Sequence, residues 1–188
     1  MQGDRTASAW IARPVVDPAG VATLRDHLYG WLGAPEPYRR EDDPHVSVFG
    51  IRLPADRAAD FENDFESFAG SVCDWRGRTD GYHLYPSARN PMVVALDVPT
   101  DLERLASPIA DLLARYDGRV GRGPHPAHVT LFKGGVRGEE LQWAQLEEAT
   151  RDRLAAVLDG GDERLDPPVR LVDPSVRIEL GPPELAWN

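Results

Sequence analysis

Two short segments of the chain share one pattern, HVSV at residues 45–48 and HVTL at residues 128–131. Each segment consists of a histidine, an apolar residue, a residue with a hydroxyl group and a second apolar residue. Because successive side chains of a β-strand point to opposite faces, a strand presents the histidine and the hydroxyl on one face and sends both apolar residues into the core. The sequence therefore predicts two matching units, each with an acid/base group beside a hydroxyl group.

Two such units can perform acid/base chemistry on a phosphate ester. An imidazole has an ordinary pKa of about 6.5, so one ring can be neutral while a second ring, held near an anion, stays protonated. The neutral ring takes a proton from an attacking hydroxyl or water, and the protonated ring gives one to the leaving oxygen. The hydroxyls of Ser47 and Thr130 can donate hydrogen bonds to the phosphate oxygens on which charge accumulates. This chemistry needs no cofactor and no metal ion.

Length and charge limit the class of protein. A chain of 188 residues can bury a sizeable core, and we expect residues 1–188 to form a single domain. The formal net charge of −10 argues against a long nucleic-acid duplex as partner, because duplex binders usually carry a large basic surface. A small anionic substrate needs only a local positive pocket. The one lysine of the chain, Lys133, follows the second motif directly.

Targeting signals and cysteine usage point to a cytoplasmic protein. The chain has no apolar run of about 18 residues and no basic segment followed by an apolar stretch at its start, so we expect neither a membrane partner nor a secretory signal. The single cysteine, Cys73, excludes an internal disulfide, and we expect its side chain to be buried or half-buried.

The periodicity of apolar residues predicts two comparable stretches, each with the order strand, helix, motif strand. The first stretch comprises a strand at 8–16, a helix at 22–32 and a strand at 45–53; the second comprises a strand at 91–99, a helix from Thr100 to 116 and a strand at 127–132. This internal duplication predicts an α/β (α+β) fold with two lobes related by a pseudo-twofold. Antiparallel sheets carry helices outside, and the motif strands face each other across a central cleft.

The remaining elements are expected to complete the two lobes. Asp56 is expected to cap a helix that ends near residue 72, in which Phe61, Phe65 and Phe68 form a core stripe. Further predictions are a strand at 81–86, a tight connection at 87–90, a helix at about 138–158, and short strands at 170–172 and 176–180.

The segments PHVSVFG and PAHVTLFKGG resemble the paired motifs of the two-histidine phosphoesterase superfamily, which includes 2′-5′ RNA ligase-like proteins and plant-type cyclic nucleotide phosphodiesterases. The separation of 83 residues between His45 and His128 is typical of that family. The likeness spans about residues 9–133, because Tyr85-Pro86 and the following ARNPMVVALDV resemble the family's aromatic-Pro turn and central strand.

The resemblance implies roles for individual residues. His45 and His128 become the catalytic histidines, Ser47 and Thr130 the hydroxyls that bind the phosphate, and Lys133 a basic contact to the phosphate. Serine replaces the commoner threonine in the first motif, which is a mild change because both offer one hydroxyl. A further side chain, that of Tyr85, can stack on a nucleobase at the edge of the cleft.

The implied activity is metal-independent hydrolysis of a nucleotide phosphodiester, either a 2′,3′-cyclic phosphate or a 2′-5′ linkage, by a monomer that acts on a small nucleotide or an RNA end. Three alternatives stay open: a 2′-5′ RNA ligase acting on tRNA-like fragments, a phosphodiesterase for oligonucleotide or cyclic second messengers, and a nucleotide-binding module without turnover. A fold hosts many activities, so the family resemblance does not select among them.

Several other polar residues near the motifs have competing interpretations. His125 and His128 have a spacing that a metal ion could use, although no carboxylate ligand is obvious. The acidic run at 41–43 would repel a phosphate if it pointed inward, so we expect it to face solvent. Arginines near the two motifs can form a positive rim around an anion site or merely occupy surface positions; they are Arg39, Arg40, Arg52, Arg119 and Arg122.

Overall fold

The computed structural model describes residues 5–31, 38–40, 42–85, 92–98, 102–122, 126–134, 152, 155–156, 164 and 173–188. The helices are α1 (Ala19–Trp31), the 3-10 helix η1 (Ala55–Arg57), α2 (Ala58–Ala69) and α3 (Glu103–Ala114). The strands are β1 (Thr6–Pro14), β2 (Tyr38–Arg40), β3 (His45–Pro54), β4 (Trp75–Arg78), β5 (Asp80–Tyr85), β6 (Met92–Asp97), β7 (Arg119–Arg122), β8 (His128–Gly134), β9 (Arg177–Leu180) and β10 (Glu184–Trp187).

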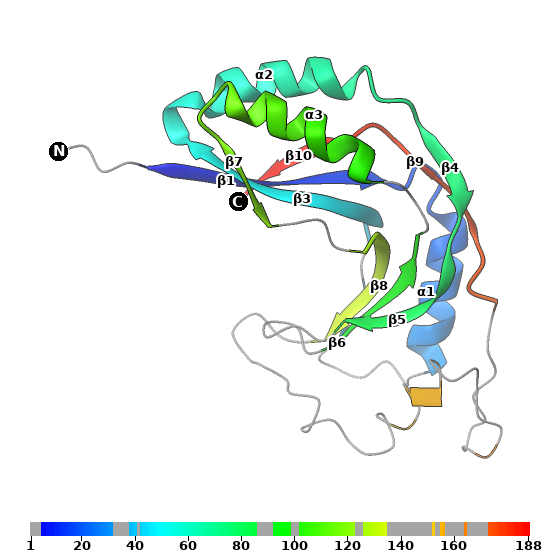
Figure 1. Ribbon diagram of the computed structural model, residues 1–188. Helices are drawn as coiled ribbons and strands as arrows, with labels where there is room; N and C mark the ends of the chain where they lie inside the picture. Colours follow the sequence, from blue (N-terminus) through cyan, green and yellow to red (C-terminus); the bar gives the residue numbers. More distant parts are fainter. Residues whose placement is uncertain are drawn as a thin grey trace.

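Within the described residues, one eight-stranded sheet has the order β10-β1-β3-β8-β6-β5, with β2 paired to β8 and β7 paired to β3. Its pairs are antiparallel. The motif strands β3 and β8 are joined by the pair Val46–Val129 at their N-terminal ends, and from there they run apart (Figure 1). This pair divides the sheet into a first half (β10, β1, β3, β7) and a second half (β8, β6, β5, β2).

The two halves have the same arrangement of strands, and the sequence stretch of each half contributes a short strand and a helix to the other half. β1 pairs with motif strand β3, as β6 pairs with motif strand β8. The short strand before each motif strand pairs with the other motif strand, since β2 pairs with β8 and β7 with β3. The helices cross over in the same way, because α1 contacts β8 and α3 contacts β7. The predicted internal duplication and the α/β (α+β) class are therefore confirmed.

The helices cover the sheet with apolar faces. α2 and α3 lie together over the first half, whereas α1 lies beside β8 (Figure 1). Phe61 and Phe65 of α2 are buried and Phe68 packs against the core, so the aromatic stripe is part of the core as predicted. Buried residues of both halves form a single hydrophobic cluster. No described helix has the length and apolar character that crossing a membrane requires.

A bulge in each motif strand changes which residues face the core. Along β1 the register passes from Ala12 opposite Ser47 to Ile11 opposite Phe49, so Val48 is the extra residue of β3. An extra residue reverses the alternation of side chains beyond it. As a result Val46 and Val48 face the core before the bulge, and Phe49, Ile51 and Leu53 face it afterwards.

The second motif strand carries its bulge at the equivalent place. Ala95 lies opposite Thr130, and the preceding residue of β6, Val94, lies opposite Phe132, which leaves Leu131 as the extra residue of β8. In both motif strands the bulge therefore comes directly after the hydroxyl residue.

The predicted helix cap at Asp56 is wrong. Asp56 lies inside η1, and α2 has Arg57 at its N-cap without a side-chain hydrogen bond, because the chain already turns helically after Pro54. The helix predicted to start at Thr100 has Leu102 at its N-cap.

The prediction for Cys73 is also wrong, since its side chain is exposed in the loop after α2. The sequence interpretation missed strands β2, β4, β7 and β10. The predicted connection at 87–90 and the predicted strand at 170–172 lie outside the described residues, as does nearly all of the helix expected at 138–158.

Candidate functional site

The two motif histidines are held in the same way. His45 is the first residue of β3 and His128 the first residue of β8. The Nδ1 atom of His45 lies 2.9 Å from the carbonyl oxygen of Asp43, and Nδ1 of His128 lies 2.9 Å from the carbonyl oxygen of Pro126. A carbonyl oxygen only accepts, so Nδ1 carries the proton in each ring. In the neutral form of each imidazole, Nε2 is then the basic atom.

The sheet register brings each histidine next to the hydroxyl of the other motif. Val46 lies opposite Val129, and continuing this antiparallel register by one residue places His45 across from Thr130 and Ser47 across from His128. Such cross-strand neighbours have Cβ atoms about 5 Å apart. Val46 and Val129 are buried on the core side, so the four polar residues share the other face, as the alternation predicts.

The burial of these four residues is unequal. His45, Ser47 and His128 are half-buried, whereas Thr130 keeps only 8% of its surface exposed. The neighbouring strand places an alanine beside each hydroxyl residue, Ala12 opposite Ser47 and Ala95 opposite Thr130. The cavity described below is lined by both Ala12 and Ser47.

Backbone hydrogen bonds fix the residue before each histidine. The amide of Val15, just beyond β1, donates to the carbonyl of Pro44 at 3.0 Å. The amide of Val98, just beyond β6, donates to the carbonyl of Ala127 at 2.9 Å. Each turn that enters a motif strand is thus tied to the end of the neighbouring strand. These bonds hold the residue that lies between each histidine and the carbonyl, of Asp43 or of Pro126, to which its imidazole donates.

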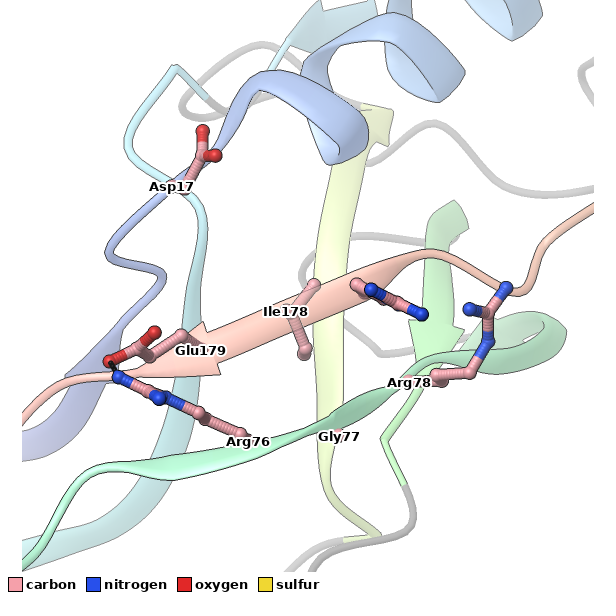
Figure 2. A pocket seen from close by; sticks show the side chains of 7 residues that line it. Asp17, Arg76, Gly77, Arg78, Ile178 and Glu179 are labelled. Atoms are coloured by element: carbon pink, nitrogen blue, oxygen red, sulfur yellow. Dashed lines mark hydrogen bonds and ion pairs between the residues drawn. The ribbon is translucent and has the colours of Figure 1, made fainter.

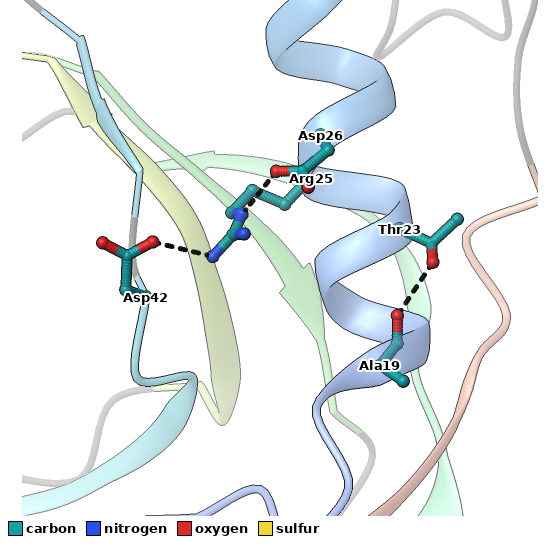
Figure 3. Close-up of polar contacts among 5 residues, drawn as sticks. All are labelled: Ala19, Thr23, Arg25, Asp26 and Asp42. Atoms are coloured by element: carbon teal, nitrogen blue, oxygen red, sulfur yellow. Dashed lines mark hydrogen bonds and ion pairs between the residues drawn. The ribbon is translucent and has the colours of Figure 1, made fainter.

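An ion pair adds a second anchor to the first motif. Arg25 of α1 reaches across to the segment before β3, where its Nη1 lies 3.2 Å from Asp42 Oδ1 (Figure 3). Its Nε lies 3.0 Å from Oδ1 of Asp26 on the same helix. The Arg25 side chain is 12% exposed, so the pair is shielded on the arginine side. It holds the segment whose next residue, Asp43, accepts the His45 hydrogen bond.

A cavity of about 710 Å³ contains His45 and Ser47. It extends over β1 and β10, where Trp10, Ala12 and Glu184 line it. Asp42 and Asp43 are exposed to solvent, as expected. They also line the cavity. Sequence reasoning missed the contribution of β1 and β10. The available signal was the alternation in β1, which sets Trp10, Ala12 and Pro14 on the face opposite buried Ala9 and Ile11.

A buried arginine lies behind the first motif, on the core side of the sheet. Arg13 is 5% exposed and pairs in the ladder with Val46. Its Nε donates to the carbonyl of Gly181 at 2.6 Å, and its Nη2 donates to the carbonyls of Leu180 and Cys73, each at 2.9 Å. Burial lowers the pKa of the Arg13 guanidinium, and the negative charge of Asp74 acts in the opposite direction. Arg13 thus connects β1, the end of β9 and the loop after α2.

Lys133 and Tyr85 are located by their backbones. Lys133 of β8 lies opposite Val93 and Arg39, and Tyr85, the last residue of β5, also lies opposite Val93. The backbone register therefore puts all four on one row across the second half. The side chains of Lys133 and Tyr85 lie outside the described residues, as does all of His125.

Two of the five arginines near the motifs fit the surface interpretation and not the rim. Arg52 and Arg119 lie opposite each other in the register of β3 and β7, near the C-terminal end of β3. At about 3.3 Å per residue, Arg52 is more than 20 Å along the strand from His45, too far to surround the same anion.

A second cavity, of about 590 Å³, lies over the β4-β9 ribbon (Figure 2). It contains none of the predicted site residues, and several of its polar groups have structural partners. Arg76 pairs with Glu179 at 2.9 Å, a hydrogen bond that raises the pKa of Arg76. Arg78 donates to the Oγ and the carbonyl of Ser175. Among the described residues, no cluster of three or more His, Cys, Asp or Glu side chains is placed to hold a metal ion.

Comparison with known proteins identifies solved structures with a similar fold. No protein-family model and no curated protein sequence matches the chain. Among solved structures, E. coli LigT complexed with 3′-AMP aligns with a TM-score of 0.51 and 15% identity over 96% of this chain and 95% of LigT. A structure described as a phosphoesterase aligns with a TM-score of 0.47 and 15% identity, over 98% of this chain and 96% of its own. The chain therefore has a fold similar to that of LigT.

Proposed function

We propose that this protein is a two-histidine phosphoesterase that hydrolyses nucleotide phosphodiesters, with His45 and His128 as the general acid and base. One observation carries the proposal: both imidazoles donate Nδ1–H to a carbonyl two residues earlier, and the register sets each beside the hydroxyl of the opposite motif. Residues 1–188 act as one domain and as a monomer.

The mechanism assigns one proton transfer to each histidine. The neutral ring accepts a proton from water at Nε2 while the water oxygen forms a bond to phosphorus. The other ring, protonated at Nε2, donates its proton to the ribose oxygen whose bond to phosphorus breaks. The product is a phosphate monoester with a free hydroxyl, and each ring ends in the protonation state in which the other began. Proton exchange with water restores both, so the cycle requires no metal ion.

Two hydroxyl groups stabilise the transition state. Ser47 Oγ and Thr130 Oγ1 donate hydrogen bonds to the nonbridging oxygens of the phosphate, on which negative charge increases. The burial of Thr130 strengthens its bond, because water competes less for the same oxygen. Lys133, whose backbone is on the same strand, adds a positive charge for the phosphate.

The substrate is a nucleoside 2′,3′-cyclic phosphate or a 2′-5′ linkage. The LigT structure, similar in fold, is a complex with 3′-AMP, a small nucleotide that carries its phosphate on the ribose. A cavity of about 710 Å³ has the size typical of a small-molecule site and is large enough for one nucleotide.

The test is hydrolysis of the four nucleoside 2′,3′-cyclic phosphates and of 2′-5′-linked dinucleotides in the presence of a chelator. We expect the parent protein to turn over at least one substrate class without loss in the chelator. Replacing either histidine, as His45→Gln or His128→Gln, is expected to lower kcat about 10²- to 10⁴-fold. The pH profile of the parent should be bell-shaped, and each variant should lose one limb.

A matched control uses another histidine of the same chain. His27 is exposed on α1, so His27→Gln should leave kcat and the pH profile unchanged. Full activity of His45→Gln or His128→Gln, or abolition of the parent activity by the chelator, would overturn the proposal. Nucleotide binding without turnover under all conditions would identify a binding module instead.

A further inference from the structure

We propose that the part of the cavity over β1 and β10 is a nucleobase subsite in which Trp10 stacks on the base and Glu184 accepts hydrogen bonds from it, giving a preference for guanine. This inference rests on the proposed function, because it assigns the base of the substrate whose phosphate lies between His45 and His128. It is carried by the residues that line the cavity together with the histidine and hydroxyl of the first motif.

The sheet register gives the subsite its position. Ala12 lies between Ser47 on β3 and Glu184 on β10 in one row across three strands. Neighbouring strands are about 4.8 Å apart, so the backbone of Glu184 lies about 10 Å from that of Ser47. The residue between them carries only a methyl group, and nothing larger from β1 separates the hydroxyl from the carboxylate. This spacing matches the extent of a nucleoside between its phosphate and the far edge of its base.

Trp10 supplies the apolar surface of the subsite. It lies two residues before Ala12 on β1, about 7 Å away along the strand and on the same face. Its neighbours across the ladder are small, Gly50 on β3 and Ala186 on β10. The indole is half-buried and lines the cavity. An aromatic side chain beside a phosphate site is a stacking surface for a base.

The charges of the cavity decide which part of a substrate lies there. Its described lining includes the carboxylates of Asp42, Asp43 and Glu184, and Asp42 is paired with Arg25. Carboxylates repel a second phosphate and only accept hydrogen bonds. The favoured occupant is therefore an uncharged base that donates. Guanine presents two adjacent donors, N1–H and the N2 amino group, which one carboxylate can accept together, whereas adenine, cytosine and uracil lack that pair.

The test compares bases on a constant phosphate. The substrates are the 2′,3′-cyclic phosphates of guanosine, adenosine, cytidine and uridine, with ribose 2′,3′-cyclic phosphate as a comparator without a base. We expect kcat/KM to be highest for guanosine and at least 10-fold lower for the comparator. Trp10→Ala should raise KM for all four nucleotides about 10-fold with little change in kcat, and Trp10→Phe should restore most of the loss.

The charge of Glu184 is tested separately. Glu184→Gln keeps the size of the side chain and should remove most of the guanosine preference while leaving the uridine substrate nearly unaffected. Matched controls are Trp75→Phe on β4 and Glu66→Gln, exposed on α2, neither of which lines the cavity. Equal kcat/KM for all five substrates, or an unchanged preference in Glu184→Gln, would overturn the subsite while leaving the hydrolase intact.

A binding measurement separates this inference from the proposed function. Calorimetric titration with guanosine 3′-monophosphate and with ribose phosphate needs no turnover. Tighter binding of the guanosine compound, lost in Trp10→Ala, supports the subsite even if every phosphodiester proves inert. Equal binding of both compounds contradicts the subsite whatever the catalytic result.

Discussion

In β3 a bulge follows Ser47, and in β8 a bulge follows Thr130 at the equivalent place, yet the residues around the two bulges differ. The position beyond the bulge is Gly50 in the first half and Lys133 in the second. The residue behind the motif, on the neighbouring strand, is buried Arg13 in the first half and Leu96 in the second. The two halves therefore agree in backbone and in acid/base groups and differ in what surrounds them.

The shared residues and the differing residues of the two halves have different roles in the structure. Where the halves agree, the residues set the position of an imidazole and a hydroxyl, as the paired carbonyl bonds of His45 and His128 show. Where they differ, buried Arg13 holds other parts of the chain together. Under the proposed function, the duplicated frame supplies the two proton-transfer groups, and the differing residues are the place to look for recognition of different parts of the substrate.

The strongest test of the equivalence compares the two hydroxyls. Ser47→Ala and Thr130→Val should each lower kcat about 100-fold, because each removes one donor to the charged oxygens of the transition state. KM should change little. Steady-state kinetics on the preferred cyclic phosphate measures both effects, and circular dichroism checks that the variants stay folded.

A fall in kcat in only one of the two hydroxyl variants would contradict the functional equivalence of the two motifs. If Thr130→Val is impaired and Ser47→Ala is not, the phosphate contacts the buried hydroxyl alone, and the two motifs are equivalent in backbone only.

The next effect concerns Arg13, whose equivalent position in the second half is Leu96. Arg13→Met removes the donor of three hydrogen bonds and leaves the carbonyls of Gly181, Leu180 and Cys73 without that partner. We expect the free energy of unfolding to fall by about 3 kcal/mol, measured by urea denaturation. The exposed Arg76, changed to Met, should alter it little, because surface ion pairs contribute weakly. An equal, small loss in both variants would mean that Arg13 is not a connection between elements.

The smallest expected effect comes from Tyr82 on β5, the outer strand of the second half. Burial, together with the negative charge of Asp173, raises the pKa of Tyr82 on β5 to about 12. The folded pKa lies above the unfolded value of about 10, so the stabilisation is complete below pH 10 and is lost as the pH rises toward 12. Melting temperatures at pH 9 to 11 should fall more steeply for the parent than for Tyr82→Phe. Parallel curves would contradict a role of Tyr82 ionisation.

The sequence predicts the motif strands well because their signal is local. HVSV and HVTL alternate polar and apolar residues, and the polar types are rare in a buried strand, so both their position and their facing could be read directly. The helices α1 and α3 were found by their apolar spacing. The duplication followed from the repeated order of these elements.

The missed parts depend on partners far away in the sequence. β4 and β7 read WRGR and RVGR, with arginine and glycine in place of an apolar alternation, and they become strands because β9 and β3 pair with them. The alternation in β1 indicates the face of Trp10, but its contribution to the cavity together with Glu184 requires knowing that β1 lies between β3 and β10. The bulges were hidden as well, since VF and LF resemble ordinary strand residues.

The pair Val46–Val129, where the two halves of the sheet meet, has one more consequence. If one half rotates against the other about this junction, displacement grows with distance from it, so Lys133 and Trp10 shift farther than the residues next to the valines. His45 and His128 are those next residues. The spacing of the two imidazoles is therefore the quantity that such bending of the sheet would alter least. Under the proposed function, ligands of different size could then be accommodated at the outer strands while the two histidines keep their separation.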